Sequence, residues 1–241
     1  MANADMKVVA LMARKGGCGK SSLVKALASA ALSSGRTALV IDTDPQGDVT
    51  LWFQKLQARG AVPPGVSFHS ATTSADLEDT IIAAQEAGQT DLVFIDTAGS
   101  GTEWSDEIAM VADHLVTPVL PSDADMLICA QTVDWFKRLR GRVAEPDRLP
   151  THSVLLTRFP AQAKTTKVHQ RMLQEAMTRF PLVGIVVQER TAYVEMDEQG
   201  FLGDLVASYR KHADPLQRSH ARRFEEAVVE CSEVLTDVLR G

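Results

Sequence analysis

Short apolar runs alternate with longer amphipathic segments along most of the chain. The apolar runs have the length of buried strands, and the amphipathic segments repeat their apolar residues at the spacing of helices. This alternation is typical of βαβ units, in which helices cover both faces of a parallel sheet. The predicted strands span 7–13, 37–41, 91–95, 114–120, 153–157 and 183–187, and the predicted helices span 22–33, 75–87, 126–139, 166–180 and 218–239.

These elements predict an α/β fold with a doubly wound, mostly parallel sheet flanked by helices. We find no internal repeat, no low-complexity tract and no linker long enough to separate two domains in the sequence. The proline-containing stretch 60–65 is expected to be a surface loop. Residues 1–241 are therefore predicted to form one domain, which is an ordinary size for this fold class.

Composition narrows the class of protein. Of the 241 residues, 45% are hydrophobic, which is enough to bury a sizeable core and argues against a disordered chain. The longest apolar runs are far shorter than the roughly 18 residues of a membrane span, and the first residues lack a secretory signal pattern. We therefore expect a cytoplasmic protein that does not enter a membrane. The wide spacing of Cys18, Cys129 and Cys231 argues against a disulfide framework, a zinc site or a cluster-binding loop.

Charge is distributed unevenly around a formal net charge of -6. The segment 60–136 contains thirteen acidic residues and neither lysine nor arginine, whereas the segment 137–223 contains sixteen basic and nine acidic residues. A basic surface on an acidic protein is a candidate site for a polyanion. The alternative is that these residues only form solvated helix faces, and the charge pattern alone leaves both interpretations open.

A glycine-rich segment joins the first predicted strand to the first predicted helix. Its glycines allow backbone N–H groups to surround phosphate oxygens, and the start of the helix adds partial positive charge. Lys20 is placed to reach the terminal phosphates of a nucleotide, and Ser21 to offer its hydroxyl to Mg2+. This order of strand, glycines, Lys-Ser pair and helix predicts a nucleotide site. The segment reads Arg14-Lys15-Gly16-Gly17-Cys18-Gly19-Lys20-Ser21-Ser22, and residues Gly16 to Ser22 are the expected nucleotide contacts.

Aspartates follow two further predicted strands. Asp42 and Asp44 come after the second strand, and Asp96 follows the strand 91–95. Ligands of doubly wound folds bind at the carboxyl ends of parallel strands, so these carboxylates are expected near the glycine-rich segment. Phosphoryl transfer needs charge neutralisation and a positioned water, which two acids can divide between them. The alternative is that these aspartates only close turns at the ends of strands.

The run from Lys15 to Ser21 resembles the deviant Walker A motif of the ParA/MinD family of ATPases, a type of P-loop NTPase. In that family the first lysine reaches across a dimer interface to the nucleotide of the partner subunit. The resemblance therefore implies that Lys15 acts in trans and that ATP binding makes a homodimer. The alternative is that Lys15 is an ordinary exposed lysine beside a P-loop.

The same resemblance assigns further roles. It implies that Lys15, Lys20 and Asp44 are the catalytic residues, with Asp44 at the hydrolytic water. Asp96 would be the Walker B aspartate, although the paired prolines often seen after it are missing here. Arg158 and Arg190 stand where family members line the adenine pocket, or else they are surface arginines. The residues implied to hold Mg2+ are Ser21, Asp42 and Asp96.

Basic residues gather where the last predicted helix opens, in the segment 214–223. Cations at a helix N-terminus oppose the helix dipole by roughly 0.3–1 kcal/mol each, which suggests a function for them. Non-specific contact with DNA phosphates is one such function, and family members without a separate DNA-reading domain use basic residues near this helix. The alternative is intrahelical pairing of Arg222 and Arg223 with Glu226. The candidate DNA contacts are Arg218 first, then Arg222, Arg223 and Lys211.

The whole pattern resembles a small ParA protein without a helix-turn-helix domain. The run 188–192, followed by 200–202, is similar to the ParA-like proteins of conjugative or T-DNA transfer. This resemblance implies an ATPase that binds DNA as a dimer and hydrolyses ATP slowly, under the control of a small DNA-binding adaptor or a relaxosome component. The alternatives are a MinD-like positioning ATPase and an ATP-dependent metabolic enzyme. The acidic tail 224–241 argues against binding to anionic lipid.

Overall fold

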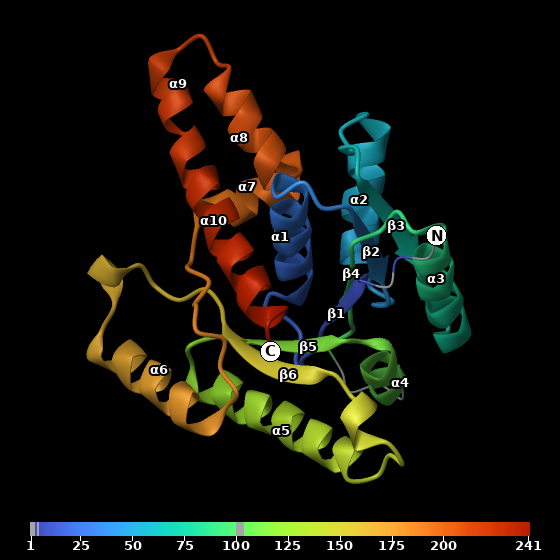
Figure 1. Ribbon diagram of the computed structural model, residues 1–241. Helices are drawn as coiled ribbons and strands as arrows, with labels where there is room; N and C mark the ends of the chain where they lie inside the picture. The colour runs from blue at the N-terminus through green and yellow to red at the C-terminus, as the bar shows by residue number, and fades with distance from the viewer. Residues whose placement is uncertain (1–2, 4, 100–103) are drawn as a thin grey trace.

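Six parallel strands form one sheet in the residues that the structure describes, which are 3, 5–99 and 104–241 (Figure 1). The structure is a computed structural model. The strand order β3-β2-β4-β1-β5-β6 takes the chain first to one side of β1 and then to the other, which confirms the doubly wound prediction. Part of the segment 1–7, in which we expect no secretory signal, lies outside the described residues. The strands are β1 (Lys7–Leu11), β2 (Ala38–Asp42), β3 (Val66–Ser70), β4 (Leu92–Asp96), β5 (His114–Val119) and β6 (Thr151–Leu156).

Helices cover both faces of this sheet (Figure 1). None of the helices in the described residues is long and apolar enough to cross a membrane. Two short 3-10 turns, η1 (Pro146–Arg148) and η2 (Gln162–Lys164), flank β6. The α-helices are α1 (Lys20–Ser33), α2 (Asp48–Ala58), α3 (Ser74–Ala87), α4 (Trp104–Val111), α5 (Asp123–Arg140), α6 (Lys167–Arg179), α7 (Thr191–Gln199), α8 (Leu202–Arg210), α9 (Pro215–Ser219) and α10 (Ala221–Val238).

Alternate residues of the central strands enter two separate cores. Val9 and Leu11 of β1 pack with α1 and α10 on one face, whereas Val8 and Ala10 pack with α3, α4 and α5 on the other face. A third cluster joins β6 to α5 and α6. Since both faces of the central strands are covered, β1, β2 and β4 are apolar except at one end, which is why the sequence pattern locates them.

The parallel register brings three strand ends to the same level. Leu11, the last residue of β1, pairs with Asp96 of β4, and Asp42 of β2 pairs with the same Asp96. The glycine-rich segment begins just beyond β1, so it lies beside both aspartates. The sheet itself therefore collects the three parts of the predicted site at one edge.

The sequence pattern is wrong about two segments at the margins of the sheet. It misses the edge strand β3, in which only Val66 and Phe68 are apolar. It also predicts a strand over 183–187, which the structure does not contain. There, Val183 N donates to Val154 O and Val187 N donates to Leu156 O. The two donors are four residues apart, whereas the two acceptors on β6 are only two residues apart, so the segment has two extra residues between these hydrogen bonds. The segment follows β6 but bulges out of a continuous ladder.

The last predicted helix is divided in the structure. The short helix α9 ends at Ser219 and α10 begins at Ala221, so Arg218 lies on α9 and not on the long terminal helix. Asp214 caps α9, because its side chain accepts a hydrogen bond from Leu216 N. The pattern also misses α2, α4, α7 and α8, which are at most 11 residues long.

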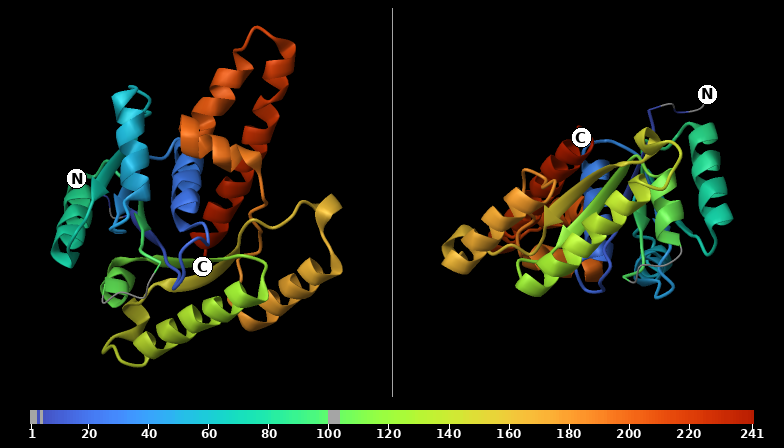
Figure 2. Two further views of the ribbon diagram at one scale, coloured as in Figure 1. Left: turned by 180° about the vertical axis from the view of Figure 1, so that it is seen from behind. Right: turned by 90° about the horizontal axis from the view of Figure 1, so that it is seen from below.

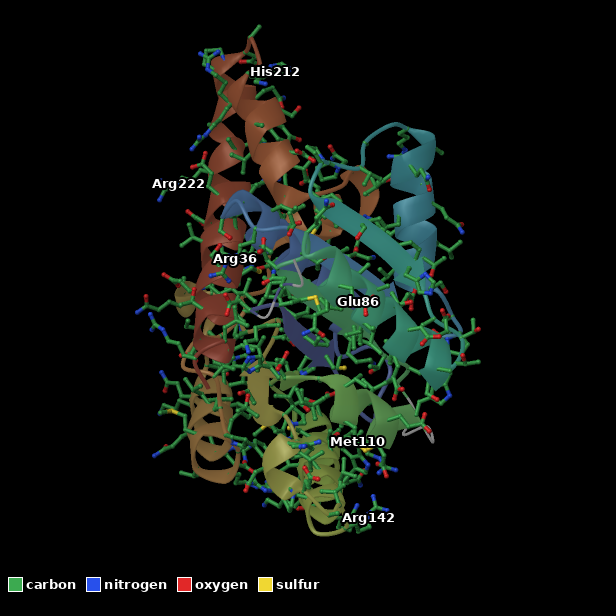
Figure 3. The ribbon with its side chains drawn as sticks, turned by 45° about the vertical axis from the view of Figure 1, so that its right-hand side comes forward. Arg36, Glu86, Met110, Arg142, His212 and Arg222 are labelled. Atoms are coloured by element: carbon green, nitrogen blue, oxygen red, sulfur yellow. The ribbon has the colours of Figure 1, made fainter. Side chains whose placement is uncertain are left out.

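Helices α8, α9 and the first turns of α10 form a projecting hairpin (Figures 1 and 2). Figure 3 shows His212 at its tip and Arg222 pointing away from α10. Gly203, near the start of α8, lies against Ser33 at the end of α1. The hairpin therefore extends from the end of α1 that is opposite the glycine-rich segment.

The hairpin depends on Phe224, which is fully buried and stacks on Tyr209 of α8 at a centroid distance of 5.2 Å. We expect Phe224→Ala to lower the free energy of unfolding by about 3–5 kcal/mol, because it leaves a cavity between α8 and α10. Chemical denaturation measures this change. The matched control is Val229→Ala on the same helix, where the side chain is exposed and the expected change is within about 0.5 kcal/mol. Equal effects of the two substitutions would contradict this packing.

Candidate nucleotide-binding site

The glycine-rich segment forms a loop whose shape requires its glycines. Gly17 and Gly19 have φ angles of 79° and 92°, in the left-handed region that other residues avoid. Gly19 is the N-cap of α1 and offers no side-chain cap, so the first N–H groups of α1 are left for an anion. The loop is also tightly covered, since a Cβ on Gly99 would lie 2.5 Å from the nitrogen of Gly16. Gly99 is thus a part of the site that the sequence analysis did not single out.

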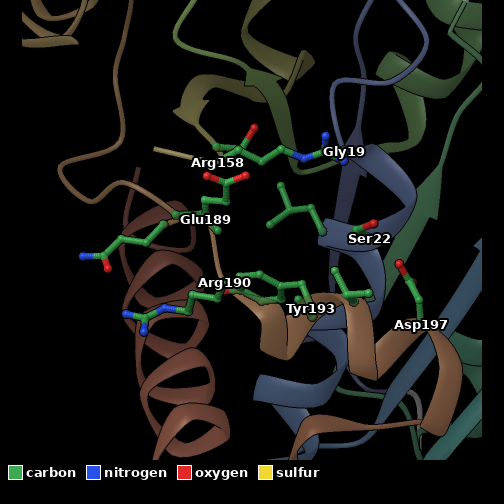
Figure 4. Close-up of a pocket in the computed structure, with 13 residues that line it drawn as sticks. Gly19, Ser22, Arg158, Glu189, Arg190, Tyr193 and Asp197 are labelled. Atoms are coloured by element: carbon green, nitrogen blue, oxygen red, sulfur yellow. The ribbon is translucent and has the colours of Figure 1, made fainter. Parts of the chain in front are cut away.

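Two adjoining cavities open above this loop. The first is lined by the loop and by residues that follow β2 and β4, including Asp44 and Gly99. The second lies between α1, the end of β6 and α7, and Figure 4 shows its lining. The two cavities share Gly19, Ser22 and Arg158. The structure therefore brings together most of the predicted nucleotide contacts, namely Gly16, Gly17, Gly19, Lys20, Ser21, Ser22 and Arg158.

Cys18 and the two lysines of the loop all contact groups of their own chain, and Cys18 and Lys20 are buried. The Cys18 thiol is buried, and burial raises its pKa, so this residue offers the site its backbone and not a reactive thiolate. The buried Lys20 ammonium donates to the carbonyl of Lys15 at 3.3 Å. The Lys15 ammonium donates to Asp125 Oδ1 at 2.9 Å. Both lysines are thus held by groups of their own chain.

The two aspartates after β2 have different environments. Asp42 is buried and accepts hydrogen bonds from Thr50 N and Thr50 Oγ1, both at 2.8 Å, and from Asp44 N at 3.0 Å. Asp42 therefore fixes the turn and the start of α2. Asp44 lines the first cavity and accepts a hydrogen bond from Gln46 N at 2.9 Å. Of the two, Asp44 is the carboxylate that faces the loop across an open space.

Asp96 is the most unusual group in the site. It is fully buried, and neither carboxylate oxygen has a hydrogen-bond partner among the described residues. Burial raises the pKa of Asp96 to about 7, while the Ser21 hydroxyl beside it opposes this shift.

An unpartnered buried carboxylate next to a P-loop serine fits the surroundings of a hydrated Mg2+ ion. The described residues contain no group of three or more His, Cys, Asp or Glu side chains able to hold a metal. Magnesium would therefore take its remaining oxygens from phosphates and water, as is usual for this ion.

Two arginines border the second cavity. Arg158 has a φ of 50°, a rare conformation for a residue other than glycine, and Figure 4 shows its side chain extending toward Gly19. Arg190 lines the same cavity, but its guanidinium turns to α10 and pairs with Glu226 at 3.0 Å and Glu230 at 3.2 Å. Tyr193 of α7 also lines this cavity, and the sequence analysis missed it because it did not predict α7.

The candidate DNA contacts lie away from both cavities, on the projecting hairpin. Arg218 donates hydrogen bonds to the backbone carbonyls of His212 and Ala213 at 2.9 and 2.8 Å. Both acceptors are uncharged, so these bonds do not neutralise the positive charge of Arg218. Lys211 is exposed at the end of α8.

The other two candidates are paired with acids. Arg222 pairs with Glu226 at 3.0 Å, as the alternative interpretation expects. Arg223 is half-buried, pairs with Glu195 at 2.8 Å and lies over the Tyr209 ring, so it does not pair with Glu226. These contacts leave Arg218 and Lys211 as the more available cations.

Comparisons with known proteins match nearly the whole chain. Residues 6–240 match the family described as VirC1 protein. The chain belongs to the VirC1 protein family. This VirC1-family chain is 26% identical over 239 residues to protein virC1 of Rhizobium radiobacter, which covers 98% of this chain and 100% of that protein. It is 25% identical over 200 residues to protein ParA of the same organism, with 81% and 84% covered.

Solved structures share the fold of this VirC1-family chain. A Cyanothece McdA variant in complex with ATP is similar with a TM-score of 0.62 and 16% identity, and the match covers 94% of this chain and 98% of that chain. Together with the ParA relative, these findings confirm the predicted resemblance to a small ParA-type protein.

The unpartnered Asp96 carboxylate predicts an unusual response to mutation. We expect Asp96→Asn to raise the melting temperature of the nucleotide-free protein by several degrees, because it removes a buried charge without a partner. In a chain of this size, about 1 kcal/mol corresponds to roughly 2–4 °C. The control is Asp42→Asn, which weakens three hydrogen bonds and should lower the melting temperature. Thermal unfolding of both variants measures this, and shifts of the same sign would contradict it.

Proposed function

We propose that the protein is a Mg2+-dependent ATPase of the ParA type that converts ATP to ADP and phosphate. The observation that carries this proposal is the position beside the glycine loop of the Asp96 carboxylate, which has no hydrogen-bond partner in the part of the chain that the structure describes. In this assignment the loop N–H groups and Lys20 bind the phosphates, and the adenine binds in the second cavity next to Arg158. The ATP-bound McdA structure, which has the same fold, supports this assignment.

The reaction needs few residues of the chain. Lys20 neutralises charge on the phosphates, and Asp44 orients the attacking water across the first cavity. Ser21 and Asp96 would hold Mg2+, and Asp42 acts by fixing the turn that carries Asp44. When bound, Mg2+ supplies charge stabilisation to the phosphoryl group. We propose that this hydrolysis is slow and that a partner protein accelerates it.

In the proposed cycle, ATP binding makes a homodimer in which Lys15 reaches the nucleotide of the partner subunit. The dimer binds DNA non-specifically through the projecting hairpin, led by Arg218 and Lys211, and a small DNA-binding adaptor or relaxosome component triggers hydrolysis. The relatives named VirC1 and ParA support a role in DNA transfer or plasmid partition. A membrane-binding role of α10 is disfavoured, because Phe224, Val234 and Leu235 of this helix are already buried in the core.

Dimerisation is expected to require ATP, Mg2+ and Lys15. Sedimentation should show that Asp44→Ala accumulates as a dimer with ATP and Mg2+, because the water step is blocked. Lys15→Ala should stay monomeric under the same conditions, although it keeps the loop that binds nucleotide. A Lys15→Ala protein that dimerises like the unchanged chain would contradict the trans role of this lysine.

DNA binding is expected to depend on the hairpin. In a mobility-shift assay with ATP, Arg218→Glu and Lys211→Glu should each weaken DNA binding severalfold and reduce its salt dependence, because each removes a phosphate contact. The matched control is Lys167→Glu, an equal charge reversal on the exposed start of α6, far from the hairpin (Figure 1). If the control weakens binding as strongly, the DNA surface lies elsewhere.

A further inference from the structure

The wall of the second cavity contains an acid that the proposed phosphate contacts do not use. Tyr193, Val194 and Asp197 line this cavity at spacings of three and four residues, so they share one face of α7. Asp197 is the last of them along the helix, and its side chain is 43% exposed. This face of α7 therefore ends in a carboxylate that a ligand in the cavity can reach.

Asp197 is held in place by Lys25 of α1. The Lys25 ammonium donates to Asp197 Oδ1 at 2.8 Å, and it lies 5.4 Å from the centre of the Trp52 ring. The Lys25 side chain is only 8% exposed, so the lysine is fixed between α1, α2 and α7. The second carboxylate oxygen, Asp197 Oδ2, accepts no hydrogen bond from the described residues. A preoriented oxygen thus remains available to a ligand.

The contact with Lys25 places Asp197 near the start of α1. Lys25 follows Ser22 by three residues, so these two side chains are neighbours one turn apart on α1. Ser22 lines both cavities, and the phosphates are expected beside the N-terminal turn that contains it. Figure 4 shows Asp197 on the same side of the second cavity as Ser22, and Glu189 on the other side. The carboxylate therefore borders the junction where the sugar of a nucleotide must link phosphates and base.

We propose that Asp197 binds the ribose hydroxyls of the nucleotide and makes the site selective for ribonucleotides over deoxyribonucleotides. This inference rests on the proposed function, in which the phosphates of ATP bind at the loop and its adenine binds in the second cavity. A carboxylate oxygen is a pure acceptor, and hydroxyl donors bind it more strongly than they bind an uncharged acceptor.

The ion pair with Lys25 makes an acid tolerable at this position. A carboxylate without a countercharge would repel a triphosphate a few ångströms away. Lys25 offsets this repulsion, because its ammonium contacts the same carboxylate that faces the cavity. Lys25 is therefore a positioning residue, and Asp197 is the group that touches the sugar.

The alternative is that this ion pair only joins α1 to α7. A purely structural pair affects ATP and 2′-deoxyATP equally, because both nucleotides meet the same folded site. The ratio of their dissociation constants therefore separates the two roles. The matched control is Glu198, the next acid of α7, whose side chain is exposed and is absent from the described lining of the two cavities.

The test measures dissociation constants of the full chain for ATP, 2′-deoxyATP and 3′-deoxyATP by calorimetric titration with Mg2+. We expect the unchanged chain to bind ATP about tenfold more tightly than at least one of the deoxy analogues, because that analogue lacks a hydrogen bond to a charged group. Asp197→Ala should bind all three nucleotides within about twofold of one another. Glu198→Ala should keep the ratio of the unchanged chain.

A second variant guards against loss of folding. Asp197→Ala leaves the Lys25 ammonium buried without its countercharge, which destabilises the chain. The double variant Lys25→Met with Asp197→Ala removes both charges, and thermal unfolding checks that it is folded. This double variant should also bind ATP and the deoxy analogues within about twofold of one another.

Equal affinities of the unchanged chain for ATP and both deoxy analogues would overturn the inference. A preference for ATP that persists in the two Asp197 variants would overturn it as well. Inosine triphosphate keeps the ribose but lacks the amino group of adenine. If the Asp197 variants lose only the preference for ATP over inosine triphosphate, Asp197 contacts the base and the ribose assignment is wrong. Failure of the proposed function has a different signature, in which the unchanged chain binds none of these nucleotides.

Discussion

The parallel register of β2, β4 and β1 is the constraint on which the site depends. It sets Asp42 and Leu11 level with Asp96, so the loop that leaves β1 must pass beside two carboxylates. Gly99 then brings the segment after β4 so close to Gly16 that a side chain would collide with the backbone. The same close packing buries Asp96 and leaves its oxygens without partners in the described residues. The buried Asp96 carboxylate therefore favours the binding of a cation at the place where phosphates are expected to bind.

Ion pairs within the chain determine which cationic side chains can contact a ligand without first leaving an acidic partner. Lys15 is occupied by Asp125, and Arg190 is occupied by Glu226 and Glu230 of α10. Glu226 also accepts a hydrogen bond from Arg222, so one carboxylate links Arg190 at the wall of the second cavity to Arg222 in the part of α10 that belongs to the hairpin. The cavity and the hairpin are therefore connected through α7 and α10, although they lie at opposite ends of α1.

Several predictions from the sequence failed or fell short for identifiable reasons. Segment 183–187 has the apolar content of a strand, but its register against β6 is broken by two extra residues, which no pattern in the segment itself reveals. Edge strand β3 was missed because only one of its faces meets a core, so few of its residues are apolar. Arg223 is the kind of residue that is usually a surface cation, yet Glu195 of α7 and Tyr209 of α8 enclose it.

The sequence by itself determined the fold class, the P-loop and the strand ends that bear Asp42, Asp44 and Asp96. These features are local or periodic, because strand burial, glycine conformation and helix starts depend on neighbours in the chain. Only the tertiary structure decided that Asp96 has no hydrogen-bond partner among the described residues, that Asp125 pairs with Lys15 and that Arg190 faces α10. Each of these depends on residues that only packing brings together, such as Lys15 and Asp125, which are 110 positions apart.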